Sequence, residues 1–94
     1  MLKNSWYKIE LTHEQYSEGI HMAVKRSFEN NYHHIGKGVA IFISNVLNDS
    51  YNLYISPSDN RYIQAIIEDF KAIPCSPPME DVHLLTGDSD IKIL

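Results

Sequence analysis

The segment from Gly38 to Val46, GVAIFISNV, constrains the fold more than any other part of this chain. It is almost continuously apolar and rich in β-branched residues, a pattern typical of a strand that is covered on both faces or lies at the centre of a sheet. The turn-forming residues Asn48-Asp49-Ser50 follow it, and Tyr51, Leu53 and Ile55 then recur at every second position. This spacing predicts an antiparallel hairpin in which residues 38–46 form the central strand.

A strand and a helix are expected before this hairpin. Tyr7, Ile9 and Leu11 alternate with charged residues, as in a strand with one buried face. Thr12 and Gln15 have the spacing of a capping box, which predicts a helix from Thr12 to about Asn30. Its buried stripe would consist of apolar residues spaced three or four apart: Tyr16, Ile20, Ala23, Val24 and Phe28.

A second helix is expected after the hairpin. Ser56 can serve as its N-cap with Pro57 at the first helical position, which would place Asp59 near the positive end of the helix dipole. Apolar residues at helical spacing (Ile63, Ile66, Ile67 and Phe70) predict its buried face, and Pro74 prevents its continuation.

The remaining residues complete a two-layer pattern. Residues 74–78 read as an extended crossing segment, 82–85 as a strand, and 91–94 as a short strand or a packed tail. The resulting β-α-β-β-α-β order predicts a single α+β domain over residues 1–94, a two-layer sandwich with a mostly antiparallel sheet and two helices on one face. A ferredoxin-like arrangement is one version that this order allows.

Composition limits the cellular setting and the chemistry. No apolar run approaches the ~18 residues of a membrane span, and residues 1–8 lack the apolar stretch of a secretory signal. A single cysteine, Cys75, is in keeping with a reducing compartment, so we expect a cytoplasmic protein. A sequence pI near 5.6 gives no electrostatic footprint for binding nucleic acid.

Three groups of residues have side chains suited to chemistry. Glu14, Glu18 and His21 have helical spacing suited to metal binding, but polar residues opposite a core stripe are more often a solvated face. The adjacent pair His33-His34 can coordinate or titrate, or simply cap a hydrated helix end. Cys75 with His83 or a helix histidine could form a nucleophile and base, yet its Pro-rich flanks favour a packed, unreactive thiol. We therefore expect no catalytic residue, no metal and no cofactor.

Charge is distributed unevenly along the chain. From Gly38 to Leu94 eight acids face three bases, a net charge of −5, whereas residues 1–37 carry +1. An acidic surface steers encounters with a basic protein, and Tyr and Trp are enriched among interface anchors. Trp6, Tyr32, Tyr51, Tyr54 and Tyr62 are expected to be exposed aromatics. The partner-binding residues predicted on these grounds are Asp59, Glu68, Asp69, Glu80, Asp81, Asp88, Asp90, Tyr54 and Tyr62.

A family resemblance rests on three segments of the second half. Residues 54–57 (YISP), 72–78 (AIPCSPP) and 84–88 (LLTGD) are similar to a pattern in small bacterial proteins, and the whole resembles the immunity proteins of contact-dependent growth inhibition and other polymorphic toxin systems. The resemblance covers about the last 45 residues. It implies stoichiometric neutralisation of a basic toxin domain, commonly a nuclease, by a protein that is a monomer or weak homodimer when free.

Two other classes of function remain open from the sequence. One is another acidic inhibitor or adaptor, for example of phage type. The other is a small enzyme or metal protein that uses Cys75 and the histidines. The identity and activity of the partner, the interface residues and the strand order are not set by the sequence.

Overall fold

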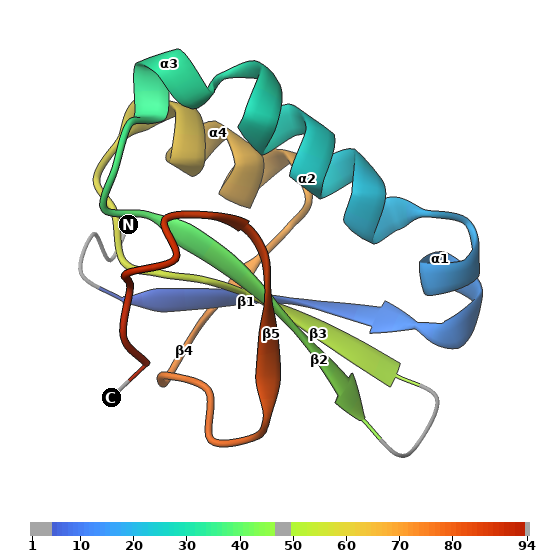
Figure 1. Cartoon of the computed structure of the whole chain (residues 1–94). Coiled ribbons are helices and arrows are strands. Elements are labelled where there is room, and N and C mark those ends of the chain that lie inside the picture. Colours follow the sequence, from blue (N-terminus) through green and yellow to red (C-terminus); the bar gives the residue numbers. More distant parts are fainter. Residues whose placement is uncertain (1–4, 47–49, 94) are drawn as a thin grey trace.

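The computed structural model describes residues 5–46 and 50–93, which form one five-stranded antiparallel sheet with helices on one face (Figure 1). The strands are β1 (Trp6–Thr12), β2 (Ala40–Val46), β3 (Ser50–Ile55), β4 (Ile73–Cys75) and β5 (Val82–Gly87). The helices are α1 (His13–Ser17), α2 (Ile20–Asn30), α3 (Tyr32–Ile35) and α4 (Arg61–Asp69). This arrangement confirms the predicted α+β sandwich.

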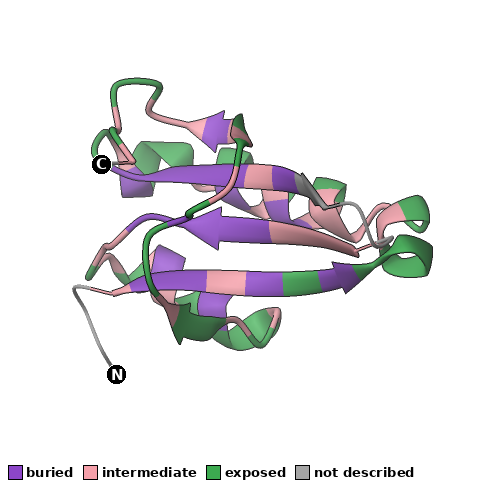
Figure 2. Ribbon diagram, turned by 90° about the horizontal axis from the view of Figure 1, so that it is seen from below, coloured by how far each residue is buried: buried purple, intermediate pink, exposed green. Residues whose placement is uncertain are grey.

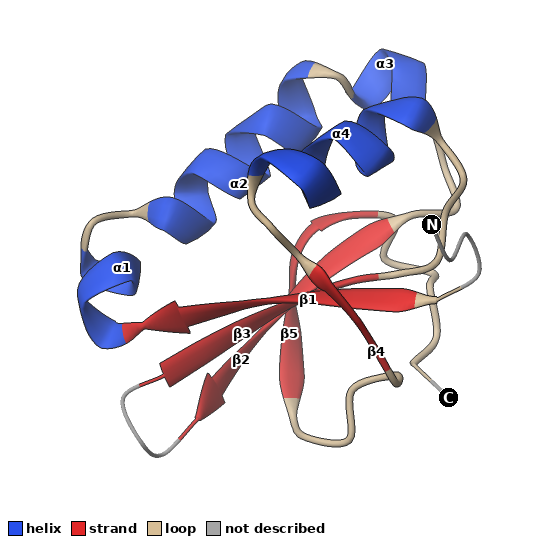
Figure 3. Cartoon of the chain, turned by 180° about the vertical axis from the view of Figure 1, so that it is seen from behind, coloured by secondary structure: helices blue, strands red, loops and turns tan. Residues whose placement is uncertain are grey.

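The sheet order is β4-β1-β3-β2-β5. The first four strands therefore have the order of a ferredoxin-like sheet, in which two βαβ units interleave and the helical connections cross on the same face. Figure 3 shows α2 and α4 side by side above this face, with β4 descending from the end of α4 beside β1. The fifth strand, β5, extends the sheet beyond β2.

The first predicted helix is interrupted. The Thr12–Gln15 capping box is confirmed, since Gln15 N donates to Thr12 Oγ1 at 3.1 Å and Thr12 N donates to Gln15 Oε1 at 2.9 Å. However, Gly19 adopts a left-handed conformation (φ 84°), which ends α1 and starts α2 in a new direction. The continuous helix predicted from Thr12 to Asn30 is therefore wrong, although Val24 and Phe28 do form its buried face.

The second predicted helix starts later than expected. Asn60 is its N-cap, with Oδ1 accepting from Tyr62 N at 2.8 Å, so the prediction that Ser56 caps the helix is wrong. Ser56 is buried instead, and its hydroxyl accepts a hydrogen bond from Ala40 N at 2.9 Å. Asp59 thus precedes the N-cap and does not occupy the first turn.

The strand predictions need two corrections. Residues 38–46 were expected at the centre, but β3 is the middle strand and β2 lies between β3 and β5. Pro74 and Cys75, expected to begin the crossing segment 74–78, belong with Ile73 to the edge strand β4. Of the two alternatives for the C-terminal residues, the packed tail is confirmed for Ile91 and Ile93, and residues 91–93 form no strand. The predicted turn at Asn48 and Asp49 lies outside the described residues.

Apolar side chains cover both faces of the sheet. The larger cluster lies between the sheet and the helices and includes Phe28, Ile41, Leu53 and Ile63, which are fully buried. On the helix-free face, opposite α2 and α4, a smaller cluster contains Trp6, Ala40, Phe42 and Tyr54. Figure 2 shows the segment between β4 and β5 crossing this face. In the described part of the chain, no helix has the length and apolar character needed to cross a membrane.

Candidate interaction surface

Five of the predicted acidic residues have exposed side chains: Asp59, Glu68, Asp69, Asp81 and Asp90. The ion pair of Lys8 with Glu10, at 3.5 Å, is the one salt bridge formed among residues 5–46 and 50–93. These five acids therefore keep their charge available to an outside partner, because no neighbouring base within this part of the protein neutralises them.

The structure divides the predicted acids into two groups. Glu68 and Asp69 end α4, and Asp59 lies before the start of that helix, so these three belong to the helix layer. Glu80 and Asp81 precede β5, whereas Asp88 and Asp90 follow it. Four acids thus bracket a single edge strand, an arrangement that depends on the sheet order and was not predicted.

Glu80 has a structural role on the helix-free face. Its Oε1 accepts hydrogen bonds from the Tyr54 hydroxyl and, at 3.3 Å, from Asn52 Nδ2. The hydrogen bond from Tyr54 is the main reason that the pKa of Glu80 is lowered, so the carboxylate stays ionised. Burial, followed by the bond to Glu80, raises the pKa of Tyr54 to about 12. This network fixes the crossing segment to β3.

The prediction that Tyr54 is exposed is wrong. This residue was expected to be exposed and to contact a partner, but it is only 7% exposed, and Trp6 is similarly buried. Both rings belong to the buried cluster on the helix-free face, so the fold uses them as core. Tyr32, by contrast, is exposed as predicted.

The Asp88 carboxylate accepts two backbone hydrogen bonds at the end of β5. Its Oδ2 accepts from Gly38 N at 3.0 Å and its Oδ1 accepts from Asp90 N at 2.9 Å. Backbone N–H donors, first that of Asp90 and then that of Gly38, lower the pKa of this carboxyl group. Asp88 therefore fastens the turn after β5 to the residues that lead into β2.

The remaining predicted aromatic, Tyr62, is half-buried between helices. Its ring stacks on His34 with centroids 4.5 Å apart, and the Arg61 guanidinium lies 5.2 Å from its centroid. Asn60 Nδ2 also donates to His34 O at 3.0 Å. These contacts join α3 to α4, which gives Tyr62 and His34 a packing role.

The candidate metal ligands Glu14, Glu18 and His21 are divided between two helices. Glu14 lies in α1, Glu18 caps that helix, and His21 lies in α2 beyond the break at Gly19. His21 instead stacks on Tyr16, which in turn stacks on Tyr51, and burial lowers the pKa of His21. Within the described ranges, no three His, Cys, Asp or Glu side chains gather where they could hold a metal ion.

Cys75 lies in a shallow groove of about 390 Å³ on the helix-free face, lined also by Lys8, Tyr54 and the loop up to Glu80. Burial raises the pKa of its thiol, which disfavours the thiolate needed for nucleophilic attack. His83 belongs to β5, at the opposite edge of the sheet from β4. The sheet therefore separates the proposed nucleophile from this proposed base.

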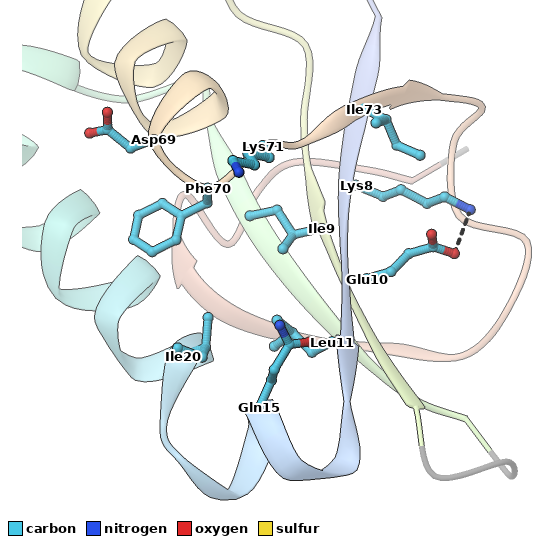
Figure 4. A pocket seen from close by; sticks show the side chains of 10 residues that line it. All are labelled: Lys8, Ile9, Glu10, Leu11, Gln15, Ile20, Asp69, Phe70, Lys71 and Ile73. Carbon is cyan, nitrogen blue, oxygen red and sulfur yellow. Dashed lines mark ion pairs between the residues drawn. The ribbon is translucent and has the colours of Figure 1, made fainter.

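A second groove, of about 380 Å³, lies where β4 ends and β1 continues beyond it (Figure 4). Ile9, Leu11 and Ile20 supply apolar walls together with Phe70, and Asp69 lies at the rim beside α4. The Lys8–Glu10 ion pair spans this edge of β1. Charged side chains of this kind protect a sheet edge from unwanted pairing.

The comparisons with family models, curated proteins and solved structures returned no match.

Proposed function

We propose that this protein binds a basic toxin domain stoichiometrically and neutralises it, as an immunity protein does. The observation that carries the proposal is the set of exposed acids (Asp59, Glu68, Asp69, Asp81 and Asp90) that form no ion pair within the described structure. A nuclease domain presents a basic surface to its nucleic-acid substrate, and an acidic protein can cover that surface by electrostatic complementarity. The proposal involves no catalytic residue and no cofactor.

The proposal includes a setting. The protein acts in the cytoplasm of the toxin-producing cell, and it is a monomer or weak homodimer before it meets its partner. Its net charge of −4 favours association with a positively charged protein over association with a second copy of itself. The toxin domain expected as partner is encoded beside the gene for this protein.

The experiment measures association with that toxin domain by stopped-flow fluorescence at rising salt. Exposed charges are screened beyond ~8 Å at physiological ionic strength, so the association rate constant should fall at least about tenfold between 20 mM and 500 mM salt. Co-expression should also rescue cells from the toxin. A rate constant that is the same at both salt concentrations, or a toxin left fully active at molar excess of this protein, contradicts the proposal.

Charge-reversal variants separate the two acidic groups. Asp81→Lys with Asp90→Lys changes the acids beside β5, and Glu68→Lys with Asp69→Lys changes those at the end of α4. Glu14→Lys with Glu18→Lys is the matched control, because both residues are exposed acids in the first half of the chain. At least one test pair should weaken binding by more than about 2 kcal/mol, the scale of interface hot spots.

A further inference from the structure

Among residues 5–46 and 50–93, no strand pairs with the outer edge of β5, so this edge presents unpaired backbone groups. Ser56 N donates to Ala40 O at 3.0 Å and Asp88 N donates to Val39 O at 2.9 Å. Successive residues of an antiparallel strand bond to opposite neighbours, so the odd-numbered residues of β2 bond to β5. His83, opposite Ile43, is therefore bonded inward. Val82 and Leu84 direct their N–H and C=O groups outward.

At the opposite edge of the sheet, the same alternation of hydrogen bonds leaves β4 unable to pair with an additional strand. Trp6 and Lys8 of β1 pair with Cys75 and Ile73, which leaves Pro74 as the outward-facing residue of β4. Proline has no N–H to donate, and β4 is only three residues long. The register of β5 against β2 shifts at Leu85, so an added strand could form a regular ladder with Val82 to Leu84 of β5 and not with β4.

The surroundings of β5 suit an extended chain with an apolar centre. Leu84 is 42% exposed on the strand. Helical spacing places Met22, Lys25 and Glu29 on one side of α2, and Glu29 Oε2 accepts a hydrogen bond from Thr86 Oγ1 at 3.1 Å. This side of α2 therefore flanks β5.

Both ends of β5 are acidic. Glu80 and Asp81 precede the strand, Asp88 and Asp90 follow it, and residues 80–91 contain no Lys or Arg. A second copy paired antiparallel about Leu84 would set Glu80 of one chain opposite Asp88 of the other. Like charges placed directly opposite each other destabilise a strand pair, so self-pairing is disfavoured and a strand with basic ends is favoured.

We propose that β5 binds an extended segment of a basic protein by β-strand addition, with backbone hydrogen bonds to Val82 and Leu84. Apolar residues of that segment cover Leu84, and Lys or Arg residues at its two ends lie beside Asp81 and Asp90. The inference rests on the proposed function for the basic character of the partner. It adds the place and the manner of binding.

The test uses the full chain and a capped synthetic peptide of sequence Lys-Arg-Thr-Val-Thr-Val-Arg-Lys. Amide hydrogen exchange is followed by NMR with and without about 1 mM peptide, a concentration suited to a weak model ligand. The amides of Val82 and Leu84 should exchange at least about fivefold more slowly when most of the protein is bound. A charge-reversed peptide with Glu and Asp ends should give no protection.

Variants that remove acidic charge test the electrostatic contribution to peptide binding. Asp81→Asn with Asp90→Asn should weaken peptide binding about three- to tenfold at low salt, and Glu14→Gln with Glu18→Gln should leave it unchanged. Basic peptide that leaves both amides unprotected overturns the proposal. Protection that rises with protein concentration in the absence of peptide also overturns it, because the occupant is then a second copy.

Neutralisation of a toxin domain and strand addition at β5 can each be disproved without disproving the other. If the toxin domain is neutralised while the amides of Val82 and Leu84 stay unprotected, strand addition is wrong and neutralisation stands. If the basic peptide protects both amides but the protein does not inhibit the toxin domain, the edge binds a basic strand and the proposed function is wrong.

Discussion

The two edges of the sheet differ in whether their backbone groups can pair with an additional strand. At one edge, β4 is short and turns Pro74 outward, and the adjoining stretch of β1 carries the Lys8–Glu10 ion pair. At the other edge, β5 is twice as long and turns two ordinary residues outward, Val82 and Leu84. Natural sheets guard their edges with proline and charge. The edge at which we propose strand addition lacks a proline, although the register shift at Leu85 confines regular pairing to its first residues.

Proline substitutions along β5 should give the largest contrast. His83→Pro removes an inward hydrogen bond to β2 and should cost about 3 kcal/mol of unfolding free energy. Val82→Pro is the matched variant: it removes only an outward donor at the first residue of the strand, and should cost less than about 1 kcal/mol. Urea denaturation measures both. Equal losses would show that the assigned alternation of β5 is wrong.

Among the glycines near this edge, Gly87 should be the least tolerant of substitution. A Cβ at Gly87 would lie 2.5 Å from Val39 O and 2.8 Å from Ala40 Cα, so Gly87→Ala should cost more than about 2 kcal/mol. Gly38→Ala is the control, because Gly38 also has a positive φ but has nothing within 4 Å of its Cβ position. That variant should lose only about 1 kcal/mol. Thermal midpoints of the two proteins would then differ clearly, and similar midpoints would argue against a close approach at Gly87.

The Tyr54–Glu80 pair should make stability depend on pH at both extremes. The folded pKa of Glu80 is lowered, so its contribution is present above its ordinary pKa of 4.5 and is lost as the pH falls through the folded value. Tyr54 has its pKa raised from 10.0 to about 12, so its contribution is full below pH 10 and declines up to about pH 12. Tyr54→Phe should flatten both limbs, at a cost of about 1 kcal/mol at pH 7. Unchanged pH dependence in this variant would contradict the assigned network.

Cys75→Ala should have the smallest effect. The half-buried thiol contributes packing to the closed edge, so the variant should lose about 1 kcal/mol and keep full affinity for the partner. Isothermal titration with the toxin domain measures the affinity. Loss of neutralisation by a stably folded Cys75→Ala protein would assign chemistry to this residue.

Local signals in the sequence predicted the elements and much of the core. The Thr12–Gln15 capping box and the stripes that include Phe28 and Ile67 depend on neighbours within a turn or two, so they can be recognised from spacing alone. The helix break at Gly19 and the cap at Asn60 were missed because several nearby residues had equally plausible roles. Tertiary packing chose among them.

The candidate site was much less predictable. The acids around β5 were chosen from a charge count, which contains no information about which strand forms the edge. Burial of Tyr54 beneath the crossing segment depends on its contact with Glu80, 26 residues away along the chain. The outward direction of Val82 and Leu84 depends on the pairing of β2 with both β3 and β5. Such non-local pairings leave no periodic signal in the sequence.

Hydrogen exchange of single amides in β5 tests the central claim most directly, first in the free protein and then in its complex with the proposed toxin partner. In the free protein the His83 amide should be protected, because it is bonded to β2, and those of Val82 and Leu84 should exchange at least about tenfold faster. In the complex, all three should be protected. Fast exchange at Val82 and Leu84 in a tight, neutralised complex would contradict the account.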